Sequence, residues 1–225
     1  MPHYGQSVLS GNPSVELVFL EYSPVGDVDR MISSRVQGRA RLASIVGGVL
    51  WALVAPVFVL LNSSQDGSAA RTLLTIAAFG VGVVSLLLLL VGLAPLYAMG
   101  ATVLGRVGIA GVLVSAIALG FVAVGNGAEL VTLTTQGRES EVGHTIFLVA
   151  LLILIVASIL VGQVFARRRW SAGARVGGMI LLLALPLGIL LLLLGNLVSP
   201  TTDLGFWAAL TVPYGVGRVL LALST

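Results

Sequence analysis

Residues 145–169 read TIFLVALLILIVASILVGQVFARRR, and this stretch decides what kind of protein the chain forms. Uncharged and mostly apolar residues run from Thr145 to Ala166, and three arginines follow at once. A helix needs roughly 20 such residues to cross about 30 Å of membrane hydrocarbon. The stretch therefore predicts a membrane-spanning helix that ends in a basic loop.

The composition of the whole chain agrees with a membrane protein. Of the 225 residues, 57% are hydrophobic and only 9% are charged, whereas globular domains are about 25% charged. The chain has no cysteine and no lysine, which excludes thiolate chemistry, cysteine-bound metals, a lysine Schiff base and a P-loop lysine. The arginines stand at the ends of apolar runs without alternating aromatics, so we expect no nucleic-acid partner.

Apolar stretches of the required length occur six times, and they lack the alternation of barrel strands. The sequence therefore predicts an all-α, polytopic membrane bundle of six transmembrane helices. The second stretch is long and can end near Pro95 in an interfacial turn, and Pro213 and Arg218 interrupt the sixth. The predicted spans are 42–61, 72–99, 106–125, 145–166, 175–197 and 205–223, which together form one domain over residues 42–225.

Arginine placement predicts how the bundle is oriented, because cytoplasmic loops are enriched in basic residues. With six spans, nine arginines fall on one side and only Arg71 and Arg138 on the other. We therefore expect both termini in the cytoplasm of a prokaryotic cell and the bundle in its plasma membrane. The predicted cytoplasmic anchors that flank the spans are Arg41, Arg106, Arg167, Arg168, Arg169 and Arg175.

Residues 1–41 form a predicted cytoplasmic segment ahead of the first span. VELVFLEY, residues 15–22, is an apolar octet that fits a short strand or an interfacial patch. A second interpretation places the start of translation at Met31, because MISSRVQGRARLAS runs from polar and basic residues straight into the first span. N-terminal mass spectrometry of the native protein distinguishes the two interpretations.

The stretch GNGAELVTLTTQGRESEVGH, residues 125–144, gathers Glu129, Glu139, Glu141 and His144. A metal site would need further ligands from other helices, and no other acidic residue or histidine lies within a span. Haem ligation by two histidines is excluded as well, because neither His3 nor His144 lies within a predicted span. We therefore expect no cofactor. We interpret the stretch as a solvated loop, with VTLTT extended along the membrane interface, QGRES as a turn, and Glu141 at the start of the fourth helix.

Other polar residues within the spans have simple structural interpretations. Ser85, Ser115, Ser158 and Thr211 can donate their hydroxyls to carbonyls of their own helices. Arg218 lies about five residues from the end of the sixth span, so its side chain can reach the interface by snorkelling. The other interpretation places Arg218 inside the bundle, where it would bind an anion.

Small residues follow one another along the third span, and they predict close packing of its backbone against another helix. This pattern favours the third span as the packing centre of the bundle or as an interface for a membrane-protein partner or a second copy. The residues of this predicted packing face are Gly105, Gly108, Gly111, Ser115 and Gly120.

Because the spans carry so little chemistry, the sequence favours a non-catalytic membrane subunit or scaffold that acts through helix packing in the lipid bilayer. The alternative is a permease or substrate-binding membrane subunit for an apolar or weakly polar small solute. Its support is the set of prolines within or near four spans, which predict kinked helices. A membrane enzyme would need the side chains of 129–144 to converge beside a pocket, and we expect no enzymatic activity.

Overall fold

The computed structural model describes residues 24–62, 69–138, 140–167, 169–198 and 204–224, and their regular elements are all helices, as predicted. VELVFLEY, Glu139 and Arg168 lie outside the described residues. The helices are α1 (Pro24–Asn62), α2 (Ala69–Val91), α3 (Ala94–Ala98), α4 (Gly100–Gln136), α5 (Glu141–Phe165), α6 (Ala172–Leu182), α7 (Ala184–Val198) and α8 (Leu204–Ser224).

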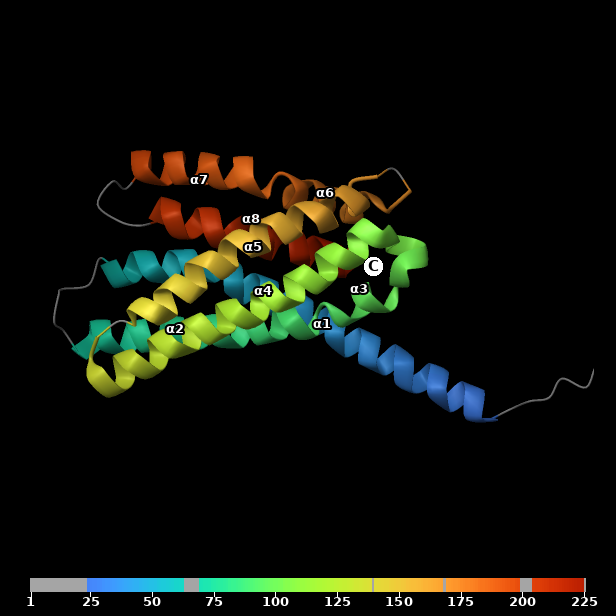
Figure 1. Ribbon diagram of the computed structural model, residues 1–225, viewed down its shortest axis with the longest axis horizontal. Coiled ribbons are helices and arrows are strands. Elements are labelled where there is room, and N and C mark those ends of the chain that lie inside the picture. The colour runs from blue at the N-terminus through green and yellow to red at the C-terminus, as the bar shows by residue number, and fades with distance from the viewer. Residues whose placement is uncertain (1–23, 63–68, 139, 168, 199–203, 225) are drawn as a thin grey trace, which may run out of the picture.

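Five of these stretches are long and apolar enough to cross a membrane as single spans: α1, α2 with α3, α4, α5 and α8. The pair α6 and α7 passes the same test together but is bent by 69° at its break, so it makes a sixth crossing if the bent pair is one span. Pro186, in the first turn of α7, has no N–H to donate to the preceding turn, which explains a break at this place. The helices run back and forth along one axis (Figure 1).

Two hydrogen bonds join segments far apart in the sequence at one end of the bundle. Arg169 Nη2 donates to the carbonyl of Val103 at 2.7 Å, and Ser171 Oγ donates to the carbonyl of Ser224 at 3.4 Å. The start of α4, the turn between α5 and α6, and the end of α8 therefore meet at one end, where the first turns of α1 also project from the bundle (Figure 1). We call this the arginine-rich end.

The helix α4 runs eleven residues beyond the predicted span, so the interpretation of VTLTT as an extended segment is wrong. Thr132, Thr134 and Thr135 donate their hydroxyls to carbonyls one turn back in the same helix. Tertiary packing in a helical hairpin outweighs the β propensity of these residues. The helix ends at Gly137, whose φ of +67° favours glycine, and the predicted turn follows there.

Helices of this bundle approach one another through paired glycines. A methyl group at Gly215 would lie 2.5 Å from the carbonyl oxygen of Gly48, and one at Gly48 would lie 2.7 Å from the carbonyl of Gly215. These contacts bring α1 and α8 together backbone to backbone. Similar pairs join α6 to α8 at Gly177 and Gly217, α4 to α5 at Gly125 and Gly143, α5 to α6 at Gly162 and Gly178, and α7 to α8 at Gly195 and Gly205.

The last helix, α8, is enclosed by its neighbours although it is the least apolar of the five single spans. It packs against α1, α6 and α7, whereas α4, which the sequence favoured as the packing centre, packs mainly against α5 and α2. Its buried face carries three glycines, so the backbones of neighbouring helices can approach it closely. The buried residues of α8 are Gly205, Thr211, Pro213, Tyr214, Gly215, Gly217, Arg218 and Leu221.

Replacing Gly215 with alanine tests the backbone contact between α1 and α8. We expect Gly215→Ala to lower the free energy of unfolding by about 1–3 kcal/mol, because the added methyl group must displace the carbonyl of Gly48. Gly127→Ala is the matched control, since a methyl group at that helical glycine meets nothing within 4 Å. Thermal unfolding of the purified full chain in mild detergent measures both, and equal stability of the two variants would contradict the contact.

Candidate functional site

The predicted packing face of α4 divides between the interior and the outside of the bundle. Gly108 and Gly111 face α5, where a methyl group at Gly111 would lie 2.9 Å from Cβ of Leu160, and Ser115 is buried as well. Gly105 instead forms the bend at the start of α4, with a φ of +72° that favours glycine. Gly120 faces open space, since a methyl group there would meet nothing within 4 Å.

The predicted cytoplasmic anchors that the structure describes lie in the segments that meet at the arginine-rich end. Arg41, Arg106, Arg167 and Arg169 are exposed, and Arg175 is half-buried near the start of α6. The guanidinium of Arg169 also lies over the ring of Trp170, 5.4 Å from its centre. This placement agrees with six crossings, and the side of the membrane on which the arginines lie stays a prediction.

Three of the four hydroxyl groups that the sequence singled out within the spans donate to their own helices as predicted, those of Ser85, Ser158 and Thr211. Ser85 donates to the carbonyl of Gly82, Ser158 to that of Leu154 and Thr211 to that of Trp207. The buried amide of Asn126 also donates across helices, from α4 to the carbonyl of Phe79 in α2, at 3.3 Å. These polar groups therefore serve the bundle itself, because their donors are used within the chain.

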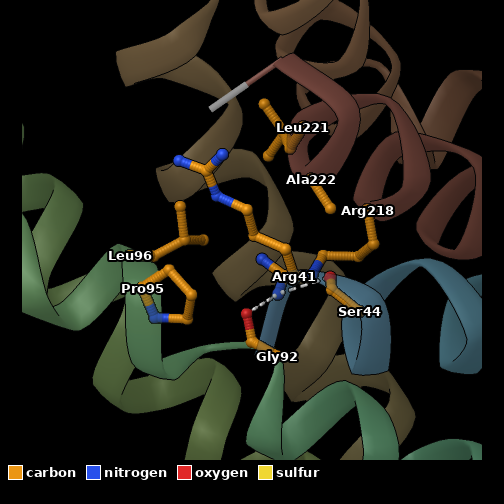
Figure 2. A pocket seen from close by; sticks show the side chains of 8 residues that line it. All are labelled: Arg41, Ser44, Gly92, Pro95, Leu96, Arg218, Leu221 and Ala222. Carbon is orange, nitrogen blue, oxygen red and sulfur yellow. Dashed lines mark hydrogen bonds between the residues drawn. The ribbon is translucent and has the colours of Figure 1, made fainter. Parts of the chain in front are cut away.

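Arg218 does not snorkel to the surface, so the prediction that it does is wrong. Its side chain is only 2% exposed, and its Nη2 donates to the carbonyl of Gly92 at 2.8 Å and to Oγ of Ser44 at 3.2 Å (Figure 2). Gly92 follows the last residue of α2, and Pro95 cannot supply an N–H to the carbonyls of that turn. The guanidinium thus satisfies a helix end whose dipole carries partial negative charge.

A narrow pocket lies beside this buried arginine at the arginine-rich end. Its volume of about 10 Å³ is room for roughly one water molecule. The lining comes from α1, from Gly92 in the turn between α2 and α3, from α3 and from α8 (Figure 2). The lining residues are Arg41, Ser44, Gly92, Pro95, Leu96, Arg218, Leu221 and Ala222. Sequence reasoning missed the partners of Arg218, and the small residues around it in α8 were the available signal.

At the other end of the bundle, the hairpin of α4 and α5 brings Glu129 and His144 together. Glu129 is only 3% exposed, its Oε2 accepts the backbone N–H of Ser140 at 2.9 Å, and its Oε1 lies 3.3 Å from Nδ1 of His144. Ser140 caps α5 by accepting the N–H of Gly143. The interpretation of the whole stretch as a solvated loop is therefore wrong for Glu129, which is fixed inside the helical hairpin.

The pair does not extend to a metal-binding cluster among the described residues, where no three acidic or histidine side chains gather. Glu141 is exposed in the first turn of α5, as predicted for a carboxylate near a helix N-terminus. The contacts of Glu129 with Ser140 and His144 join α4 to the start of α5. We call these three residues the clasp, and we assign them a structural role in the helical hairpin.

Comparisons of the chain with protein-family models, with curated proteins and with solved structures find no match. The sequence and the structure together describe a multi-pass helical membrane protein.

Removing the buried carboxylate tests the clasp between α4 and α5. We expect Glu129→Ala to lower the free energy of unfolding by about 1–3 kcal/mol, because the N–H of Ser140 loses its acceptor. Glu129→Gln keeps an acceptor oxygen and should lose less than the alanine variant does. Glu141→Gln, at an exposed site on the same hairpin, serves as the control. A loss in Glu141→Gln as large as in Glu129→Ala would contradict the clasp.

Proposed function

We propose that this membrane protein is a non-catalytic subunit or scaffold that acts through the packing of its helices. The observation that carries the proposal is how its buried polar groups are used. Ser85, Ser158, Thr211 and Asn126 all donate to carbonyls of the chain, and Arg218 donates to Gly92 and Ser44. A substrate site would need donors directed toward a ligand, whereas each of these five side chains donates within the bundle. Other buried donors, among them Nε1 of Trp51, Nε of Arg218 and the hydroxyl of Tyr214, have no partner among the described residues.

The outer surface supports the same proposal. A groove of about 300 Å³ runs between α4 and α5 on the outside of the bundle. Gly120, which precedes a groove residue, leaves open space beside it. Small residues and grooves let a second membrane helix approach closely, which drives association where lipid surrounds both partners. The groove residues are Phe121, Thr145, Ile146, Val149, Ala150 and Ile153.

Cross-linking from single cysteines tests the proposal, because the chain has no cysteine of its own. Val149→Cys places a photoactivatable maleimide in the α4–α5 groove, and Ile189→Cys places it on α7 at an equal exposure of 52%. In native membranes we expect Val149→Cys to give one stoichiometric adduct, identified by mass spectrometry as a membrane protein or a second copy. Ile189→Cys should not give it. Lipid adducts alone from both positions would contradict the proposal.

One feature favours the alternative, a permease or substrate-binding membrane subunit for an apolar or weakly polar small solute. The break between α6 and α7 faces α8 and α5 across a pocket lined in part by Ala184, Ser158, Pro213 and Tyr214. The hydroxyl of Tyr214 is buried there without a hydrogen-bond partner among the described residues. Transporters commonly bind their solutes at broken helices near the middle of the membrane. The pocket measures about 10 Å³, so a solute would enter only if the helices opened.

Labelling of a cysteine at the break between α6 and α7 by a water-soluble thiol reagent distinguishes the scaffold from the permease. The scaffold proposal predicts that Ala184→Cys, at a residue only 6% exposed, stays unlabelled by a small charged methanethiosulfonate in proteoliposomes. A permease that opens this pocket to water would allow labelling within minutes. Thr102→Cys, at an exposed position of α4, is the positive control. Labelling of Ala184→Cys at the rate of Thr102→Cys would therefore favour the permease.

A further inference from the structure

The hydroxyl of Tyr214 needs a hydrogen-bond partner that the described part of the chain does not provide. The side chain is only 5% exposed, and its hydroxyl is buried without a partner among the described residues. A buried hydroxyl without a hydrogen bond costs free energy, and buried groups that the chain leaves unbonded commonly bond an ordered water. Tyr214 lines the pocket beside the break between α6 and α7, whose volume of about 10 Å³ is room for roughly one water molecule.

Two oxygens with spare acceptor capacity belong to other residues of the same lining. Ser158 donates its hydroxyl to the carbonyl of Leu154 at 2.6 Å, so its oxygen can still accept a hydrogen bond. Pro213 has no N–H, so the carbonyl of Ala209, four residues back in α8, receives no hydrogen bond from it. This carbonyl oxygen faces α7, because a β-carbon at Gly188 would lie 3.2 Å from it.

We propose that this pocket holds one ordered water molecule, which accepts the hydroxyl of Tyr214 and donates to Oγ of Ser158 and the carbonyl of Ala209. Roughly three hydrogen bonds are usual for a buried water. The water joins α5 to α8 beside the break between α6 and α7, and it satisfies polar groups that the helices leave unbonded. The site goes beyond the proposed scaffold function, because it holds whether or not a partner binds the protein.

A sodium ion is the competing occupant, and the charges around the pocket disfavour it. No acidic residue is among those that line the pocket, and the buried Arg218 lies only four residues after Tyr214 in α8. A buried cation is costly unless an anion or several hydrogen bonds compensate it. A neutral water adds no charge beside Arg218, so it is the occupant that this pocket favours.

Removing one hydroxyl tests the site through the sign of the effect. Thermal unfolding of the purified full chain in mild detergent compares Tyr214→Phe with the wild type. We expect the unfolding midpoint to fall by about 3 °C, because the phenyl ring cannot replace the hydrogen bond to the water. Removal of an unbonded hydroxyl would instead raise the midpoint, and a rise overturns the proposal. Tyr97→Phe, at an exposed position of α3, is the control and should change nothing.

A double-mutant cycle tests whether one water is shared by the two hydroxyls, which form no direct hydrogen bond with each other. We expect Tyr214→Phe with Ser158→Ala to lower the midpoint by clearly less than the sum of the two single losses, because either substitution breaks the same bridge. Ser85→Ala with Tyr214→Phe is the matched control, since the buried Ser85 also donates to its own helix but does not line the pocket. Additive losses in both pairs would contradict a shared water.

Replacing sodium chloride with choline chloride at equal concentration identifies the occupant. Water binding predicts the same midpoint of the wild type in both salts. A midpoint that is higher in sodium, with this difference lost in Tyr214→Phe, would assign the site to a cation and overturn the proposal.

Discussion

Backbone contact at paired glycines is the constraint on which the rest of this bundle depends. Lipid tails are as apolar as leucine side chains, so burying leucine gives membrane helices little reason to associate. Close approach of backbones supplies the van der Waals contact instead, and glycine pairs make that approach at five helix interfaces. The leucine-rich faces are left for the lipid, as the exposed Leu190, Leu193 and Leu197 of α7 show.

The same constraint explains where the polar residues lie. Because Gly215 and Gly217 bring α1 and α6 against α8, the side chain of Arg218 is enclosed between helices and cannot reach the surface. It therefore takes the free carbonyl at the end of α2 and closes the arginine-rich end. At the other end, Glu129 takes the N–H of Ser140 in the same way. In a medium without water, each broken or capped helix needs such a partner.

Much of the architecture could be predicted from the sequence, because length and hydropathy alone specify membrane spans. The helical class, the apolar spans and the turn at Gly137 followed from composition, apolar length and local pattern. The burial of Arg218 could not be predicted in this way, because its partners Ser44 and Gly92 lie 174 and 126 residues away in the chain. The helical state of VTLTT was missed for a related reason, since packing against α5 outweighs local propensity there.

The measurement that tests this account most directly is a disulfide between α7 and α8. A β-carbon at Gly188 would lie 3.8 Å from Cβ of Ala209, which is the mean separation in disulfides. The account predicts that Gly188→Cys with Ala209→Cys cross-links almost completely on mild oxidation in native membranes, with no other thiol to compete. Leu190→Cys with Ala209→Cys, in which Leu190 is exposed, should not cross-link. Absence of the first disulfide, or equal yield from both pairs, would contradict helix packing through glycine contacts.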